Sequence, residues 1–325
     1  MIEIKKILCP IDFSDHSRRA LDHAVVIARW YDATITAFHV YAVPPPAAYG
    51  LESPPPVGMV LTPADRERLT TAMARFVETA NAPEMPIDIV IGQSSATANE
   101  IVKQASAMQA DLLVIGTHGR SGFDRLVLGS VAEKVLRKAD CPVLTVPRQA
   151  PDAVPVAPVV FKRILCPIDF SDSSMHALNY AMSLAQEADA SLTVLHVMVY
   201  DLEIEAPEMY ETVLADRRLS VTDYRRRCEE YSRQRLTTTV PDTVRAYCTV
   251  ETLVATGKPY REILRVVAEQ QADLIVMGVQ GRGAADLMVF GSTTQHVVRQ
   301  ATCPVLTLRT QESYWRKRHC TPAPA

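Results

Sequence analysis

Glycines concentrate in two short windows of this chain. Eight of its 12 glycines lie in two stretches of 14 residues each. They are Gly116, Gly119, Gly122 and Gly129 in the first window and Gly278, Gly281, Gly283 and Gly291 in the second. Both windows contain the spacing Gly-x2-Gly-x9-Gly-Ser. Because glycine has no Cβ, it permits sharp turns and lets a ligand approach the backbone. The spacing therefore favours a loop that binds a ligand through main-chain amides.

Each glycine window leads into a predicted helix, which begins near Ser130 in one window and near Ser292 in the other. The first amides of a helix have no partner within it, and the helix dipole favours an anion there. The dipole contributes only about 0.3–1 kcal/mol per charge, whereas micromolar affinity needs about 8 kcal/mol. Several charge-assisted hydrogen bonds must therefore converge, and the windows favour phosphate binding. The alternative is ordinary turn glycines, with Ser130 and Ser292 as N-caps.

The glycine windows belong to a longer internal repeat. Residues 7–15 recur 157 residues later, and the sequence Cys-Pro-Val-Leu-Thr at 141–145 recurs at 303–307. A period near 160 residues is the size of a whole domain, so we infer a fused duplication. The predicted organisation is a first domain over 1–147, a proline-rich linker over 148–160, a second domain over 161–310 and a tail over 311–325.

Within each copy, apolar strands alternate with amphipathic helices. The first copy predicts strands over 4–10, 34–41, 87–91, 111–115 and 143–146, and helices over 17–31, 64–80, 96–109 and 131–138. The second copy adds a longer, charged segment after its second strand, with a helix over 224–236. Strands without polar alternation are typical of sheets buried on both faces, joined by right-handed crossovers. Each copy is therefore predicted to be a five-stranded, parallel, doubly wound α/β domain.

Composition argues against several classes of partner. The 37 acidic and 34 basic residues leave a net charge of −3, without the basic surface that nucleic acid requires. No apolar run reaches the roughly 18 residues of a membrane span, and the first run meets Asp12 too early for a secretory signal. The seven cysteines do not form a disulfide pattern, and Cys9, Cys141, Cys166 and Cys303 are expected to be buried thiols. We expect a soluble cytoplasmic protein that binds neither nucleic acid nor membrane.

Three motifs occur in the same order in both copies: Ile-Leu-Cys-Pro-Ile-Asp-Phe-Ser, Gly-x2-Gly-x9-Gly-Ser and Cys-Pro-Val-Leu-Thr. With them, the chain resembles the universal stress protein family in its tandem-domain form, over nearly all of residues 1–310. The resemblance implies two Rossmann-like domains with strand order 3-2-1-4-5. Because the glycine pattern belongs to the nucleotide-binding branch of that family, it also implies an ATP site in each half, or one for AMP or ADP, with Mg2+.

The resemblance implies particular roles for residues of each copy. Backbone amides that hold the phosphates are implied at Gly116, Gly119, Gly129 and Ser130, and at Gly278, Gly281, Gly291 and Ser292. Contacts to the ribose or an associated metal are implied for Asp12 and Asp169, and contacts to the adenine for Pro10, Ile11, Val40, Pro167, Ile168 and Val197. Val131 and Thr293 complete the implied nucleotide-binding set.

Several of these residues have alternative interpretations. Asp12 and Asp169 are either ligand contacts or helix caps, and Arg120 and Arg282 either reach phosphate or are solvated. His39 and His196 are expected to be partly buried and hydrogen-bonded. A valine at Gly129 or Gly291 is expected to abolish binding and leave the fold intact.

Three functions stay open at this stage. We favour an adenine-nucleotide-binding regulatory protein of the stress response. The alternatives are a slow ATPase or phosphotransfer enzyme and an interaction scaffold without nucleotide. The two copies are expected to pack as an intramolecular pseudo-dimer, and a homodimer is a further expectation.

Overall fold

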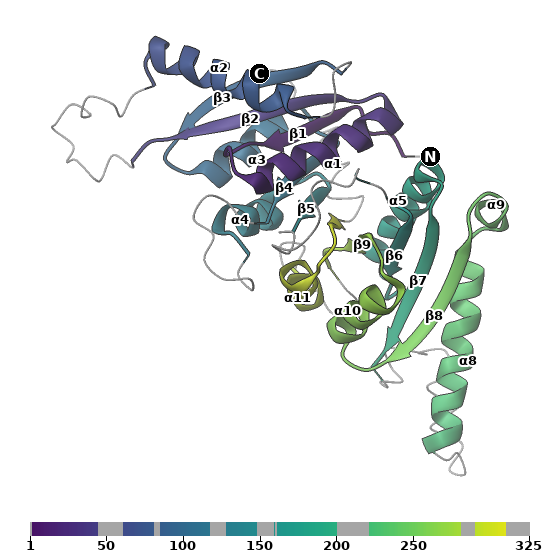
Figure 1. Cartoon of the computed structure of the whole chain (residues 1–325). Coiled ribbons are helices and arrows are strands. Elements are labelled where there is room, and N and C mark those ends of the chain that lie inside the picture. The colour runs from purple at the N-terminus through teal and green to yellow at the C-terminus, as the bar shows by residue number, and fades with distance from the viewer. Residues whose placement is uncertain are drawn as a thin grey trace, which may run out of the picture. The chain divides into compact units, whose positions relative to one another are not determined.

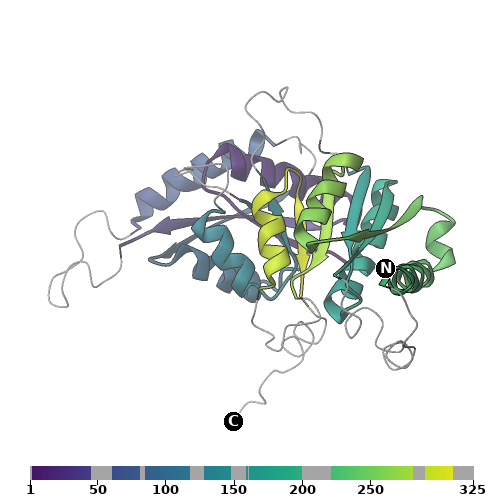
Figure 2. The same cartoon turned by 90° about the horizontal axis from the view of Figure 1, so that it is seen from below.

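The computed structural model describes residues 2–44, 61–80, 85–117, 128–147, 159, 161–199, 221–280 and 290–309. These residues divide near residue 160 into two compact units, drawn in Figures 1 and 2. Apart from Val159, the predicted linker and the predicted tail lie outside the described residues, so both stay predictions.

The first unit alternates strands and helices from its beginning to its end. Its strands are β1 (Lys6–Pro10), β2 (Thr34–Ala42), β3 (Ile87–Ser94), β4 (Leu112–Gly116) and β5 (Val143–Val146). Its helices are α1 (Asp15–Tyr31), α2 (Pro63–Glu78), α3 (Thr97–Ala107) and α4 (Ser130–Lys138).

Among its described residues, the second unit repeats this order and adds one short helix. Its strands are β6 (Arg163–Pro167), β7 (Ser191–Met198), β8 (Val250–Thr256), β9 (Leu274–Gly278) and β10 (Val305–Leu308). Its helices are α5 (Asp172–Ala188), α8 (Val221–Thr239), α9 (Asp242–Arg245), α10 (Pro259–Gln270) and α11 (Ser292–Gln300). The predicted helix over 224–236 lies within α8.

Both units contain the predicted parallel sheet. The strand order is β3-β2-β1-β4-β5 in the first unit and β8-β7-β6-β9-β10 in the second, and all of these neighbours pair in parallel. In the second unit, α10 and α11 lie side by side on one face of the sheet, with α5 and α8 on the other (Figures 1 and 2). The α/β fold and the order 3-2-1-4-5 in each half are confirmed.

The predicted element ends differ from the structure by a few residues. The helix α1 begins at Asp15 because Ser14 is its N-cap and accepts a hydrogen bond from the amide of Ser17. The strand β3 continues to Ser94, three residues past its predicted end, because it stays paired with β2 as far as Ala42. Because the last residues of this strand are not apolar, the sequence pattern did not predict the end of the pairing.

The central strands form the core of each unit. Cys9 in β1 and Cys166 in β6 are fully buried, and burial raises the pKa of both thiols. Cys141 and Cys303 are buried as well and form no disulfide, so the four predicted buried thiols are confirmed. In the part of the chain that the structure describes, no helix is both long enough and apolar enough to cross a membrane.

A buried histidine makes the first unit sensitive to acid. His23 on α1 is 6% exposed, and burial lowers its pKa to about 4. In the unfolded chain, His23 takes up a proton near pH 6.5, whereas in the folded unit it does so only near pH 4. The free energy of unfolding therefore falls as the pH drops from about 6.5 towards 4. At pH 5 the loss is about 2 kcal/mol.

We expect the variant His23→Tyr to lose most of this acid sensitivity, since the second copy carries Tyr180 at the same position. The measurement is urea unfolding at pH 7 and pH 5, followed by the fluorescence of Trp30 in a Trp315→Phe background. An equal loss of stability in variant and parent would show that other groups cause the acid sensitivity.

Candidate functional site

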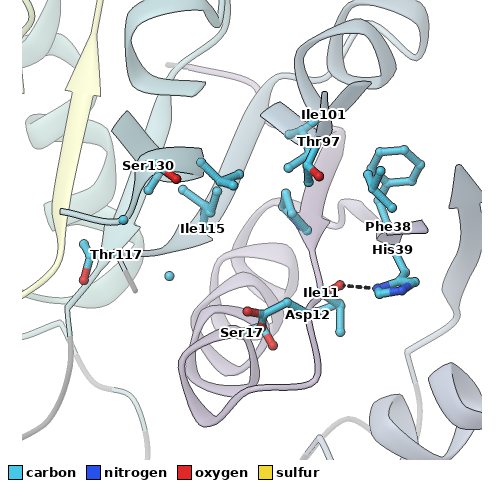
Figure 3. A pocket seen from close by; sticks show the side chains of 16 residues that line it. Ile11, Asp12, Ser17, Phe38, His39, Thr97, Ile101, Ile115, Thr117 and Ser130 are labelled. Carbon is cyan, nitrogen blue, oxygen red and sulfur yellow. Dashed lines mark hydrogen bonds between the residues drawn. The ribbon is translucent and has the colours of Figure 1, made fainter. Parts of the chain in front are cut away.

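The carboxyl ends of β1, β2 and β4 border a cavity in the first unit, at the place where α3 and α4 begin (Figure 3). Open α/β sheets bind ligands in such crevices. The cavity has a volume of about 170 Å³. Its wall contains eight of the implied site residues of this half: Pro10, Ile11, Asp12, Val40, Gly116, Gly129, Ser130 and Val131. Gly119 lies outside the described residues.

The second unit has a cavity at the corresponding place, with a volume of about 540 Å³. It too has eight implied site residues on its wall: Pro167, Ile168, Asp169, Val197, Gly278, Gly291, Ser292 and Thr293. Gly281 lies outside the described residues, as do Arg120 and Arg282. The duplication has therefore placed the same motif residues around a cavity in each unit.

The sequence did not predict several further wall residues, which lie in the strands and in the helices α1, α3 and α10. In the first unit they include Ser17, Phe38, Thr97, Ile101 and Ile115, and Figure 3 shows Thr97 close to Ile101. In the second unit, Pro259 and Ile263 of α10 take the same part. The apolar spacing of α3 and α10 predicts core packing equally well, so no sequence signal marked these positions.

The aspartate of the first motif is fixed by the helix cap beside it. The carboxylate Oδ1 of Asp12 accepts hydrogen bonds from the amide of Ser14 at 3.0 Å and from its hydroxyl at 2.5 Å. Asp169 accepts the same two bonds from Ser171 at 3.1 and 2.5 Å. The N-caps are therefore the serines, and the alternative that the aspartates themselves cap these helices is wrong. Each aspartate orients the cap and also faces the cavity.

A strained residue follows each of these aspartates. Phe13 has φ 63° and Phe170 has φ 62°, in a region where a bulky residue costs about 1–3 kcal/mol. The ring of Phe13 lies 4.8 Å from that of His39, whose Nδ1 lies 2.7 Å from the carbonyl oxygen of Ile11. Because a carbonyl only accepts, Nδ1 donates this bond.

The second unit repeats the arrangement. Phe170 lies 4.8 Å from His196, whose Nδ1 donates to the carbonyl of Ile168 at 2.9 Å. Both histidines are hydrogen-bonded as expected. His39 is half-buried as expected, whereas His196 is fully buried. The histidines stabilise the turn that ends the first strand.

The first motif glycine allows a helix to cross the end of a strand. A Cβ on Gly116 would stand 3.0 Å from backbone atoms of His16 in α1. On Gly278 it would stand 2.6 Å from the hydroxyl and 2.8 Å from the carbonyl carbon of Ser173 in α5. Contacts this short force neighbouring atoms to move. Packing therefore accounts for these two glycines, whether or not a ligand also touches them.

The last motif glycine begins the following helix. Gly129 and Gly291 are the N-caps of α4 and α11, and neither helix has a side-chain cap. Ser130 and Ser292 are the first helical residues, so the alternative that they are N-caps is wrong.

The amides of the two N-cap glycines are used within the fold. They donate to the carbonyls of Thr117 and Val279 at 2.7 and 2.9 Å. This corrects the implied role of Gly129 and Gly291 as amide donors to phosphate. The next amides along each helix belong to Ser130 and Ser292, which line the cavities.

A substitution at the first motif glycine should therefore damage the fold. We expect Gly278→Ala to lower the free energy of unfolding of the second unit by about 1–3 kcal/mol, because its Cβ overpacks the contact with α5. Urea unfolding of ligand-free protein measures the effect. Gly116→Ala, whose Cβ meets nothing closer than 3.0 Å, is the milder matched variant. Unchanged stability in ligand-free Gly278→Ala would contradict the packing role.

The expectation that a valine at Gly291 leaves the fold intact is wrong. A Cβ on this residue would stand 2.8 Å from the carbonyl oxygen of Val279. The substitution therefore disturbs the backbone that leads into α11, and a loss of binding in that variant is no measure of ligand contact alone.

Known proteins are similar to this chain in sequence and in fold. The family model described as "Universal stress protein family" matches residues 3–147 and 161–309. A universal stress protein of Methanocaldococcus jannaschii is 37% identical over 146 residues, which are 44% of this chain and 81% of the relative. A universal stress protein A homologue of Coxiella burnetii is 32% identical over 142 residues, 44% of this chain and 95% of the relative.

A solved structure resembles the whole chain. The crystal structure of a universal stress protein from Archaeoglobus fulgidus has a TM-score of 0.66 at 21% sequence identity, and the match covers 95% of this chain and 98% of that one. This match shows the α/β fold. Together with the two family matches, it makes the chain a tandem member of the universal stress protein family.

Proposed function

We propose that this protein binds an adenine nucleotide, ATP above all, in each of its two halves, and that occupancy regulates its part in the stress response. The observation that carries the proposal is the repeated cavity. In both units, motif residues surround a cavity that ends on the first turn of a helix without a side-chain cap. Such a helix start offers its amides to phosphate.

The remaining lining fits the other parts of the nucleotide. In the first unit, Ile11, Val40 and Ile101 give an apolar wall suited to a purine ring. The carboxylate of Asp12, held by Ser14, is placed to accept hydrogen bonds from a ribose hydroxyl. The second unit offers Ile168, Val197 and Ile263 with Asp169.

Mg2+ is proposed as a companion of the phosphates. Among the described residues, no group of three or more His, Cys, Asp or Glu side chains could hold a metal ion by itself. The phosphates would therefore supply most of the oxygen ligands, with Asp12 or Asp169 as the nearby carboxylate.

We also propose that the protein works in the cytoplasm. The six cysteines among the described residues are all buried and form no disulfide, as is typical of proteins in a reducing compartment.

Direct analysis of the purified protein tests the proposal. We expect ATP, ADP or AMP in the supernatant after denaturation, identified by mass spectrometry. At 100 times the dissociation constant, ATP with Mg2+ adds about 2.7 kcal/mol, or roughly 5–10 °C in the melting temperature of a domain of this size. Cyclic AMP belongs in the same titration, because one solved universal stress protein is described as a complex with cAMP. No released nucleotide and no thermal shift would sink the proposal.

Acidic substitutions at the helix starts separate binding from folding. We expect Ser130→Asp and Ser292→Asp, combined in one chain, to abolish nucleotide binding by charge repulsion. The same carboxylates interact favourably with the helix dipole, so the free energy of unfolding should stay equal or rise by about 0.3–1 kcal/mol per site. Calorimetric titration and urea unfolding measure the two effects. Retained affinity in the double variant would place the phosphates elsewhere.

The same samples distinguish binding from turnover. Asp12→Asn and Asp169→Asn keep an oxygen that accepts the two bonds from Ser14 or Ser171, but they remove the charge. We expect weaker nucleotide binding at unchanged stability. Phosphate release by the parent protein that these variants abolish would instead favour a slow ATPase.

A further inference from the structure

Resting on the proposed function, we infer that the two halves bind nucleotide unequally. The second half is the tighter site, and Phe38 is the residue that narrows the first. The two halves share their motif glycines and serines, so the difference arises from residues outside the motif.

The two cavities differ in size. The first has about 170 Å³ and the second about 540 Å³. Ligand pockets for molecules of nucleotide size typically have about 300–1,000 Å³. The volume of the second cavity lies in this range, although the large side chains of Phe290 and Gln295 line it. A nucleotide therefore fits the second cavity as it stands, whereas the first must widen.

Phe38 occupies the first cavity wall where the second has Leu195 (Figure 3). Its ring is 1% exposed, and two ring carbons lie 2.8 and 3.0 Å from the place where a Cβ on Gly92 would stand. In the strand pairing, Gly92 is opposite Val40, and the corresponding partner of Val197 is Ala255. The first half thus combines a large ring with glycine, whereas the second combines leucine with alanine.

The second half also fixes the start of its glycine window with two hydroxyl groups. Thr294 Oγ1 donates to the carbonyl of Gly278 at 2.9 Å, and Ser173 Oγ donates to the carbonyl of Gln280. The first half has Ala132, which carries no hydroxyl group, and His16 at these two positions. Because a segment that is already ordered loses less entropy on binding, these bonds favour affinity in the second half.

The lining of the second cavity also contains a threonine that the first half lacks. Thr293 lines it at the second residue of α11, where the first half has Val131. A hydroxyl next to the helix amides adds a donor for a phosphate oxygen. Cavity size, the bonded carbonyls of Gly278 and Gln280 and an added donor all favour the second half.

Calorimetric titration of the full chain with ATP and Mg2+ tests the inference. We expect two binding phases that differ at least ten-fold in dissociation constant. Ser292→Asp should remove the tight phase, and Ser130→Asp should remove the weak one. Each single variant serves as the matched control of the other, because both place the same charge at equivalent helix starts.

An exchange of the packing pair tests the role of Phe38. We expect Phe38→Leu with Gly92→Ala to tighten the first-half phase at least five-fold, measured in the Ser292→Asp background. The reverse exchange, Leu195→Phe with Ala255→Gly in the Ser130→Asp background, should weaken the second-half phase. Urea unfolding of each double variant verifies that its unit is folded.

The outcomes separate this inference from the proposed function. Equal dissociation constants, or loss of the tight phase in Ser130→Asp, overturn the inference and leave nucleotide binding in place. An unchanged first-half affinity in folded Phe38→Leu/Gly92→Ala overturns the role of Phe38. Absence of any heat or thermal shift with the parent protein overturns the proposed function and the inference with it.

Discussion

The close crossing of a helix over a strand end is the constraint on which both sites depend. In the first unit, α1 passes so near to Gly116 that a Cβ there would stand 3.0 Å from the backbone of His16, and in the second unit α5 passes Gly278 more closely still. The crossing brings the cap of the helix beside the carboxyl end of the central strand. The aspartate of the first motif and the start of the glycine window are thereby held at one edge of the sheet.

Each local feature of this edge supports another. Asp12 orients the cap Ser14, while the strained turn at Phe13 is balanced by its contact with His39. The helices that follow the second strands contact these strained phenylalanines. Phe76 of α2 lies edge-on to Phe13, and the Arg235 guanidinium of α8 lies 4.0 Å from the ring centre of Phe170. The two copies differ most in the segment after the second strand, yet the helices that follow this segment contact equivalent turns.

Duplication preserved the main-chain design and changed the side chains around it. The glycine spacing, the capping serines and the bonded histidines occur in both halves. Wall residues such as Phe38 and Leu195 differ. Main-chain geometry tolerates few substitutions, because a Cβ or a lost cap costs stability at once. Cavity walls change more freely, since a large residue packed on a small one can be exchanged for two of intermediate size, as Phe38 with Gly92 corresponds to Leu195 with Ala255. In this way one fold acquires two unlike cavities.

Much of the architecture was predictable from the chain itself. Apolar strands alternating with amphipathic helices determined the α/β class, and the repeated motifs marked both the duplication and the edge of the sheet where Asp12 and Gly129 meet. These are local signals of period and turn chemistry. Other features depend on contacts between distant segments. They are the hydrogen bond from the Gly129 amide to the Thr117 carbonyl, the helix crossing at Gly116, and the position of Phe38 in the cavity wall. Only the tertiary structure decided these, because a residue's type and neighbours in sequence do not state which distant backbone will lie against it.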